Sequence, residues 1–195
     1  MASELRNKRV AVLVDNGFEQ SELTEPKKAL EEAGAKAEII SPQASKVSGW
    51  QHGNWGDEFP VHTQLDAAKP EDYDALLLPG GVMNPDKLRI NAAAIHFIKH
   101  FVDSGKPIAA ICHGPWPLID SGGVRGRRLT SWPSLQTDLR NAGATWVDQE
   151  VVVDNGLVTS RKPDDIPAFN RKMIEEFAEG KHRPEQKERD LTTAR

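Results

Sequence analysis

The stretch KPIAAICHGPW, residues 106–116, carries the pattern that decides the fold. Its apolar first half predicts a strand of the kind buried on both faces of a parallel sheet. The strand runs directly into Cys112, the only cysteine of the chain, and a helix is predicted to follow from Gly114 to Ser121. Ala110 and Gly114 are the small residues two positions before and after the thiol. A strand, a turn with small neighbours and a helix together form the pattern of a nucleophile elbow.

The sequence on either side of this stretch alternates between predicted strands and helices. Strands are predicted at residues 8–15, 36–40, 73–78 and 106–111 and in two pieces within 150–160, helices near 21–33, 88–103, 134–142 and 166–178, and a hairpin or excursion at 45–66. This alternation indicates an α/β domain with a mostly parallel sheet covered by helices on both faces. We expect one domain at residues 1–180, followed by a polar C-terminal tail at residues 181–195.

Composition narrows the class of protein. The chain has 195 residues, a net charge of −4 and an isoelectric point near 5.9, which argue against a nucleic-acid partner. Its longest apolar runs, such as residues 10–14 and 75–78, are too short to span a bilayer, so no membrane association is expected. The N-terminus lacks the apolar stretch of a secretory signal. A single cysteine precludes an intramolecular disulfide, and a cytoplasmic location is expected.

Residues that could take part in catalysis or binding follow three of the predicted strands. Glu19 and Glu22 follow the first strand, Gly80 and Gly81 follow the third, and Cys112 follows the fourth. In open α/β sheets, ligands bind in the crevice beyond the carboxyl ends of the strands. We therefore expect a carboxylate, a diglycine and a thiol to meet in one crevice.

Two interpretations of Cys112 follow from its surroundings. A free cysteine is among the most commonly buried residues and often serves only as core packing. A cysteine at a helix N-terminus instead has its thiolate favoured, and we expect its pKa to be lowered. The preceding strand, the following helix and the diglycine Gly80-Gly81 at a neighbouring strand end favour the nucleophile.

His113 is the candidate general base, with a partly exposed residue at the crevice rim as the alternative. A base in a thiol enzyme is normally oriented by a third group, for which Asp86, Glu19 and Glu22 are the candidates. Trp116 lies one helical turn from the thiol and either walls a pocket or packs in the core. The pair His96 and His100 has helical spacing but no third ligand, so no metal site and no cofactor are expected.

Seven motifs, spread from about Arg9 to Phe177, together resemble one known family. They are VLVDNGFEQSEL, DALLLPGG, NPDKLR, GKPIAAICHGP, RGRRLTS, NAGATWVDQEVVVDNGLVTSRKPDD and PAFNRK. The chain is similar to the PfpI family, the intracellular protease and protein-deglycase branch of the class I glutamine-amidotransferase-like fold. The resemblance implies a flavodoxin-like three-layer sandwich. It also implies a homodimer or a higher homo-oligomer.

The resemblance further implies a set of site residues. Cys112 would be the elbow nucleophile, with the carboxyl of Glu19 protonated and hydrogen-bonded to its thiolate. His113 would be oriented by a carboxylate of a neighbouring subunit, and the matching position is Asp86, where we expect glutamate in the family archetype. The backbone N–H groups of Gly81 and His113 would form the oxyanion hole. The remaining residues predicted to line the oxyanion and substrate site are Gly80, Gly114 and Trp116.

Two classes of function stay open. No histidine lies between His113 and His182, so the downstream His-x-Glu of true glutamine amidotransferases is absent, which argues against glutaminase chemistry. The first class is a stress-related cysteine hydrolase that acts on glycated protein or amino-acid adducts, reactive carbonyls or peptides through Cys112. The second is a redox-sensing or chaperone-like stress protein whose Cys112 is oxidised rather than catalytic. Both classes use the same residues.

Overall fold

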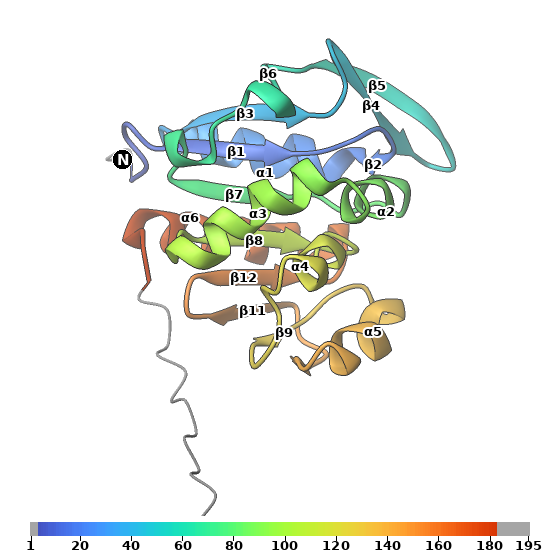
Figure 1. The fold of residues 1–195 in the computed structure, drawn as a ribbon, viewed down its shortest axis with the longest axis vertical. Coiled ribbons are helices and arrows are strands. Elements are labelled where there is room, and N and C mark those ends of the chain that lie inside the picture. Colours follow the sequence, from blue (N-terminus) through green and yellow to red (C-terminus); the bar gives the residue numbers. More distant parts are fainter. Residues whose placement is uncertain (1–3, 183–195) are drawn as a thin grey trace, which may run out of the picture.

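A seven-stranded sheet with helices on both faces forms the centre of the structure, a computed structural model that describes residues 4–182 (Figure 1). The strand order is β11-β12-β8-β7-β1-β3-β6, and every neighbouring pair is parallel except β11 and β12. The strands are β1 (Arg9–Leu13), β3 (Lys36–Ser41), β6 (Thr63–Gln64), β7 (Ala75–Leu78), β8 (Ile108–Ile111), β11 (Val151–Asp154) and β12 (Leu157–Ser160). The predicted flavodoxin-like α/β fold is confirmed.

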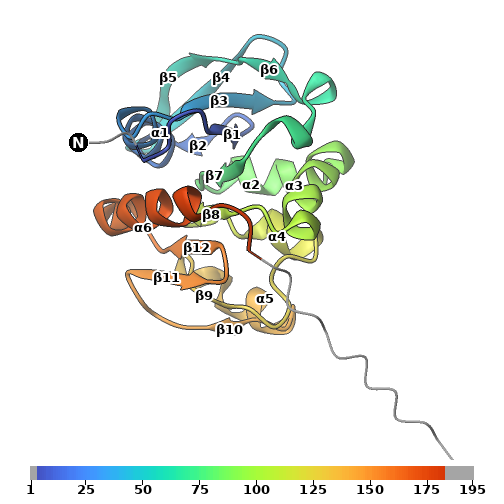
Figure 2. The same ribbon diagram turned by 90° about the vertical axis from the view of Figure 1, so that its left-hand side faces the viewer.

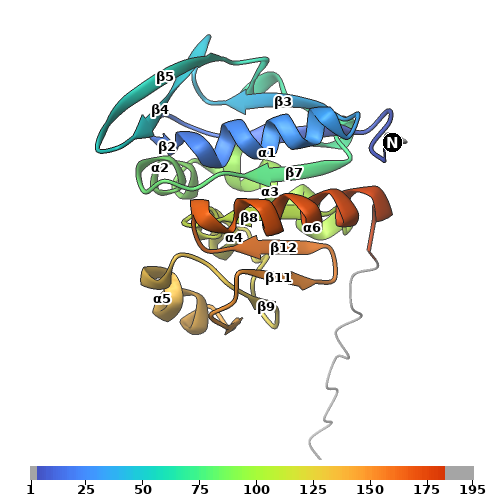
Figure 3. The same cartoon turned by 180° about the vertical axis from the view of Figure 1, so that it is seen from behind.

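Six helices surround this sheet in the described part of the chain. They are α1 (Gln20–Glu32), α2 (Met83–Arg89), α3 (Ala92–Ser104), α4 (Trp116–Asp120), α5 (Gln136–Asn141) and α6 (Ile166–Glu179). Helices α1 and α6 cover one face, seen in front in Figure 3, while α3 and α4 cover the other face. Figure 2 shows the layers from the side, with the sheet between the two groups of helices. Short 3-10 turns lie at Leu65–Ala67, Pro70–Asp72, Pro133–Leu135 and Pro163–Asp165.

The central strands are apolar throughout because both faces of the sheet are buried. In β1, Val10 and Val12 belong to the core beneath α1 and α6, whereas Ala11 and Leu13 belong to the core on the opposite face. This alternation follows from the two-residue period of a strand. With a core on each side, apolar residues are favoured at successive positions of the central strands, which explains the continuous apolar pattern of the sequence.

The helix predicted at residues 88–103 is in fact two helices, α2 and α3. The chain leaves the helical conformation at Asn91, whose side chain accepts a hydrogen bond from the backbone N–H of Ala94 at 3.1 Å. Asparagine is a favoured N-cap because it satisfies a free donor of the first turn. Ile90, which the predicted helix included, is therefore in the connection and is 85% exposed.

Two small sheets flank the main one. The predicted hairpin at residues 45–66 is present as β4 (Lys46–Gln51) and β5 (Asn54–Pro60), which extend to β2 (Phe18–Glu19). Strands β9 (Arg128–Leu129) and β10 (Thr145–Trp146) pair beside β12. The β2 strand matters most for the site, because it leads directly into α1.

The C-terminal part of the predicted domain ends in α6. Residues 183–195 of the predicted tail lie outside the described residues. The described tail residue His182 returns to the domain, where its backbone N–H donates a hydrogen bond to the carbonyl of Gly105 at 2.9 Å. Between residues 4 and 182, the helices are all too short or too polar to cross a membrane.

Candidate active site

Cys112 occupies the sharp turn at the end of β8. Its φ angle is +61°, in the left-handed region that non-glycine residues rarely adopt. Two hydrogen bonds hold the turn: the Cys112 N–H donates to the carbonyl of Ser160, and the Trp132 N–H donates to the carbonyl of Cys112. A Cβ atom at Gly114 would lie 2.3 Å from the Leu78 carbonyl oxygen, so only glycine fits there. This geometry is that of the predicted elbow, and strain of this kind is typical of functional sites.

The Gly80-Gly81 turn at the end of β7 packs directly against the thiol. A Cβ atom at Gly80 would lie 2.7 Å from the Cβ of Cys112, and Gly81 has a φ of +71°. The backbone N–H groups of Gly81 and His113 both act to lower the pKa of the Cys112 thiol, because they favour the negative charge of its thiolate. These are the two donors predicted for the oxyanion hole. Their position allows them to stabilise negative charge at or beside the sulfur.

Asn84 at the start of α2 holds this turn in place. It is fully buried, and its Nδ2 donates hydrogen bonds of 3.0 Å to the carbonyls of Pro79 and Gly80. Its Oδ1 accepts a hydrogen bond from the backbone N–H of Asp15 at the end of β1. One amide therefore ties the ends of two neighbouring strands together. The sequence interpretation did not single out this residue.

The carboxyl beside the sulfur belongs to Glu22, not to Glu19 as predicted. Glu22 is fully buried on α1, interacts with the Cys112 thiol, and its Oε2 accepts a hydrogen bond from the Gly80 N–H at 2.9 Å. Glu19 lies in β2, is half-buried, and accepts a hydrogen bond from the Ser21 hydroxyl. The correction has a simple cause: the helix begins after Glu19, so only Glu22 lies on its inner face.

Glu22 and Cys112 form a coupled pair of buried acids. Burial raises the pKa of the Glu22 carboxyl to about 8, so the group is mostly protonated at neutral pH. Burial, together with the neighbouring Glu22 carboxylate, also raises the pKa of the Cys112 thiol, against the two backbone donors. Because the Glu22 carboxylate disfavours ionisation of the thiol, the pair carries at most one negative charge in the neutral range. A protonated carboxyl beside the sulfur was predicted from the sequence, but it was assigned to Glu19 instead of Glu22.

The expected lowering of the thiol pKa is therefore wrong in direction. The expectation depended on a helix starting at the thiol, but α4 begins only at Trp116 and has five residues. The residues between them form a turn, so little helix dipole acts on the sulfur. Burial dominates instead, because the side chain of Cys112 lies beneath its neighbours and the residue is 8% exposed.

His113 lies beside the sulfur, where sequence adjacency alone did not guarantee it. Its Nδ1 is 3.3 Å from the Cys112 Sγ, and its Nε2 is 3.3 Å from the hydroxyl oxygen of Ser134. The ring is stacked on Trp132 and meets the edge of Trp116, with centroids 6.3 and 5.3 Å apart. Burial lowers the pKa of His113, so its imidazole is neutral at neutral pH.

Asp86 does not contact His113 within this chain. It is exposed on α2, and the outer ring nitrogen of His113 instead faces Ser134. A role for Asp86 across a subunit interface stays a prediction. Trp116 is half-buried, held by a hydrogen bond from its Nε1 to Asp138 and by the guanidinium of Arg89 over its ring, and its role as a pocket wall stays a prediction.

Sequence reasoning missed Ser134, Trp132 and Asn84. It named Glu22 as one of two carboxylates at the crevice and as a candidate for orienting His113, but assigned the carboxyl beside the sulfur to Glu19. A signal for Glu22 was present: it lies four residues before Pro26, which lies four residues before Leu30, and all three are buried. That spacing marks one face of a helix. Ser134 and Trp132 carried no local signal, because they reach His113 from a distant part of the chain.

Comparison with known proteins identifies the family. A match to the DJ-1/PfpI family covers residues 8–176. A Staphylococcus haemolyticus protein described as uncharacterized is 46% identical over 172 residues, which are 87% of this chain and 98% of that protein. Two solved structures extend the comparison.

The first is a two-domain Anabaena variabilis protein with DJ-1/ThiJ/PfpI-like and ferritin-like domains. It superposes with a TM-score of 0.83 at 31% identity, over 94% of this chain but only 52% of that one. The second, Drosophila melanogaster DJ-1beta, has a TM-score of 0.80 at 28% identity over 91% of both chains. With the elbow turn and the family match in agreement, this chain belongs to the DJ-1/PfpI family.

Proposed function

We propose that the chain is a stress-related cysteine hydrolase of the PfpI type, with Cys112 as its nucleophile. The observation that carries the proposal is the convergence on one sulfur of a left-handed elbow and two backbone N–H donors, from Gly81 and His113. A cysteine that served only as core packing would need neither. Oriented donors around the reacting atom are the largest source of catalysis in acyl and carbonyl chemistry.

In the proposed reaction, Glu22 holds and moves the proton. Its Oε2 is fixed by the Gly80 N–H, while its buried Oε1 has no hydrogen-bond partner among residues 4–182. The sulfur of Cys112 adds to a carbonyl carbon, and the thiol proton passes by way of Glu22 to the carbonyl oxygen. With an α-dicarbonyl such as methylglyoxal, the hydrogen on the sulfur-bound carbon then moves to the neighbouring carbonyl carbon, and the adduct becomes a thioester of an α-hydroxy acid. Water hydrolyses this thioester to the free α-hydroxy acid and returns the thiol. An acid with a pKa of about 8 is well suited to this exchange near neutral pH.

The access to Cys112 favours small substrates among the predicted classes. Cys112 is 8% exposed, and its sulfur lies beside His113, whose ring packs against Trp116 and Trp132. An early glycation adduct on an amino acid or side chain, or a free reactive carbonyl, presents a small carbonyl group to such a site. A peptide bond in an extended chain needs a longer open groove. We therefore favour reactive carbonyls and glycated adducts over peptides as the substrates of this site.

Turnover of methylglyoxal and of methylglyoxal-modified amino acids tests this function. The wild-type chain should consume them, and the Cys112→Ala variant should have no activity above the uncatalysed rate. A His113→Ala variant should lose about 10²-fold to 10⁴-fold, the usual contribution of a positioned acid or base. Equal rates for the wild-type chain and Cys112→Ala would reject the enzyme.

The second candidate function is an oxidant sensor. Its supporting observation is a thiol held between a carboxyl and two N–H donors, a setting that can also bind the oxygens of a sulfinic acid. A related solved structure is described as oxidized Toxoplasma gondii DJ-1, with 27% identity and a TM-score of 0.76 over 88% of this chain and 94% of that one. Under this function, peroxide should add two oxygen atoms to the intact mass, and only with Cys112 present, while carbonyl turnover stays at the Cys112→Ala level.

We also propose that the chain forms a homodimer. Val82 and Ile90 are exposed at the two ends of α2, on either side of exposed Asp86. Trp55 is exposed on the β4–β5 hairpin, where its ring meets the edge of Trp50. Exposed apolar residues of this size often mark interfaces. If light scattering at working concentrations gave the mass of a monomer, it would contradict both the proposed dimer and a role for Asp86 at the active site of the neighbouring subunit.

A further inference from the structure

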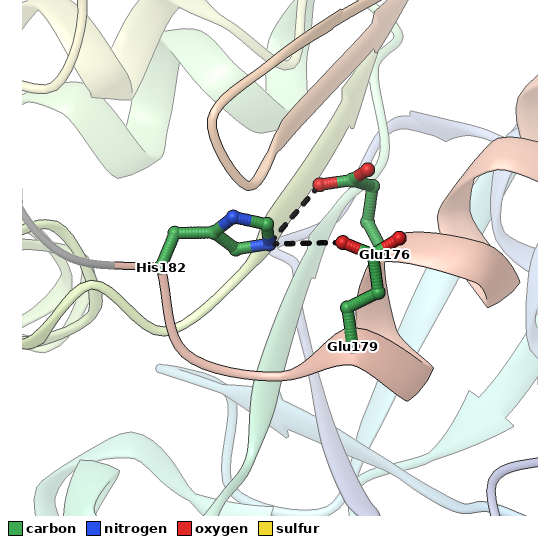
Figure 4. A group of neighbouring side chains, drawn as sticks. All are labelled: Glu176, Glu179 and His182. Carbon is green, nitrogen blue, oxygen red and sulfur yellow. Dashed lines mark ion pairs between the residues drawn. The ribbon is translucent and has the colours of Figure 1, made fainter.

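The C-terminal end of α6 brings together three potential metal ligands far from Cys112. Glu176 and Glu179 lie three residues apart on the last turn of the helix, and His182 follows three residues later (Figure 4). Gly180, with a φ of +84°, ends the helix and turns the chain back, so that the imidazole faces the helix end. One ligand atom from each side chain lies within 4.8 Å of the others.

Two of these atoms are buried without a hydrogen-bond partner. The His182 Nε2 and the Glu176 Oε2 lie 3.2 Å apart, and neither makes a hydrogen bond of good geometry within the described residues. Their side chains are only 19% and 12% exposed. Buried polar atoms in native proteins are nearly always satisfied. A nitrogen and an oxygen that face each other at this distance without a hydrogen bond of good geometry are placed so that a cation between them could bind both.

The electrostatics of this helix end favour a cation. The C-terminus of a helix carries partial negative charge, and carboxylates there are destabilising. Helix α6 nevertheless has Glu176 and Glu179 near its end and no basic residue in its last turn. One imidazole, even when protonated, neutralises only one of the two carboxylates. A divalent cation neutralises both, so it fits the charge of this cluster better.

We propose that Glu176, Glu179 and His182 form a site for a divalent transition cation of the Zn²⁺ class. Zinc binds histidine nitrogen and carboxylate oxygen at about 2.0–2.2 Å. Donors that lie 3.2 Å apart, as Nε2 and Oε2 do, leave room for an ion at that distance from both. Glu179 Oε2 lies 4.0 Å from Nε2 on a 64% exposed side chain, which is free to move in. Imidazole selects such metals over Mg²⁺.

The imidazole is positioned before any ion binds. The backbone N–H of His182 is bonded to the Gly105 carbonyl at the end of α3. Its ring packs on the turn between β11 and β12, where a Cβ atom at Gly156 would lie 2.7 Å from the ring Cδ2. Binding of the ion would therefore tie three elements together: α6, the end of α3 and the β11–β12 turn.

Zinc titration of the full chain by calorimetry tests the proposal. The Cys112→Ala variant is the starting protein, because its active site has no thiolate to compete for zinc. We expect one equivalent of Zn²⁺ to bind and to raise the unfolding temperature, as any ligand of the folded state does. Adding His182→Gln or Glu176→Gln should weaken binding at least about tenfold.

A matched control removes a histidine that is not a ligand. His96→Gln, on the exposed side of α3, should leave the zinc affinity and the unfolding temperature in zinc unchanged. Mg²⁺ in excess should not displace the zinc. The proposal is overturned if Zn²⁺ does not bind the Cys112→Ala chain, or if His182→Gln and His96→Gln bind it equally well. Neither outcome depends on the enzymatic activity of Cys112.

Discussion

Two buried glutamates, Glu22 on α1 and Glu176 on α6, lie at opposite ends of their helices and meet opposite partners. Glu22 lies in the first turn of its helix, accepts a hydrogen bond from the Gly80 N–H, and faces a thiol. Glu176 lies near the last turn of its helix and faces the imidazole of His182. Glu22 is fully buried and Glu176 is largely so, but among residues 4–182 only Glu176 has a positively ionisable neighbour within 4 Å of its carboxyl.

The difference shows two ways of burying a carboxyl. Without a cation, desolvation dominates, and Glu22 keeps its proton up to a pKa of about 8. With a cationic group beside it, a carboxyl can stay ionised and hold that group in place. The first arrangement gives a group that exchanges protons near neutral pH. The second gives a site that retains a charged ligand.

The largest effect should be the pH dependence of stability due to Glu22. Because its pKa is raised on folding, its contribution is fully present below the unfolded pKa and is lost as pH rises through about 8. Between about pH 5 and pH 8 the free energy of unfolding should fall by roughly 3 kcal/mol through this group. Urea unfolding at several pH values measures it, and a Glu22→Gln variant should lack this part of the slope. If the free energy of unfolding of that variant changed with pH as in the wild-type chain, a group other than Glu22 would carry the buried proton.

The next effect is on turnover, and it depends on the proposed enzyme. Glu22→Gln keeps the size of the side chain but cannot take up a proton, so carbonyl turnover should fall about 100-fold. Glu19→Gln is the matched control, three residues away and half-buried, and should retain most activity. Steady-state rates of the two variants compare them directly. A larger loss in Glu19→Gln would reverse our assignment of the carboxyl.

A smaller effect is expected at Ser134, whose hydroxyl faces His113 Nε2. Removing one neutral hydrogen bond costs about 1 kcal/mol, so Ser134→Ala should lower kcat about fivefold. Ser134→Thr keeps the hydroxyl and should restore most of the rate. The pH profile of turnover should shift only in the alanine variant. Equal rates and profiles in both variants would show that Ser134 does not orient the ring.

The smallest effect should appear at the helix end. Without added metal, His182→Gln should lower the free energy of unfolding by about 1 kcal/mol or less, the usual contribution of one ion pair. Chemical unfolding in the presence of a chelator measures this value. A loss several times larger would mean that His182 stabilises the fold through its packing on Gly156 rather than through Glu176.

Much of the fold was readable from the sequence. Strands buried on both faces leave continuous apolar runs, and the order of strands and helices sets a parallel sheet. The break between α2 and α3 at Ile90 and Asn91 was not predicted, because a single N-cap residue interrupts an otherwise helical apolar pattern. The elbow at Cys112 and the diglycine at Gly80 were predicted, since both depend on local residue size and lie at strand ends.

The sequence alone determined that a thiol, a diglycine and a glutamate would meet at one edge of the sheet. Only the tertiary structure decided which glutamate, because the answer depends on where α1 begins and which side chain then points inward. It also decided the charge of the pair, since burial by residues distant in sequence sets the pKa values of Glu22 and Cys112. Ser134 reached His113 in the same way, through a contact that no local pattern encodes.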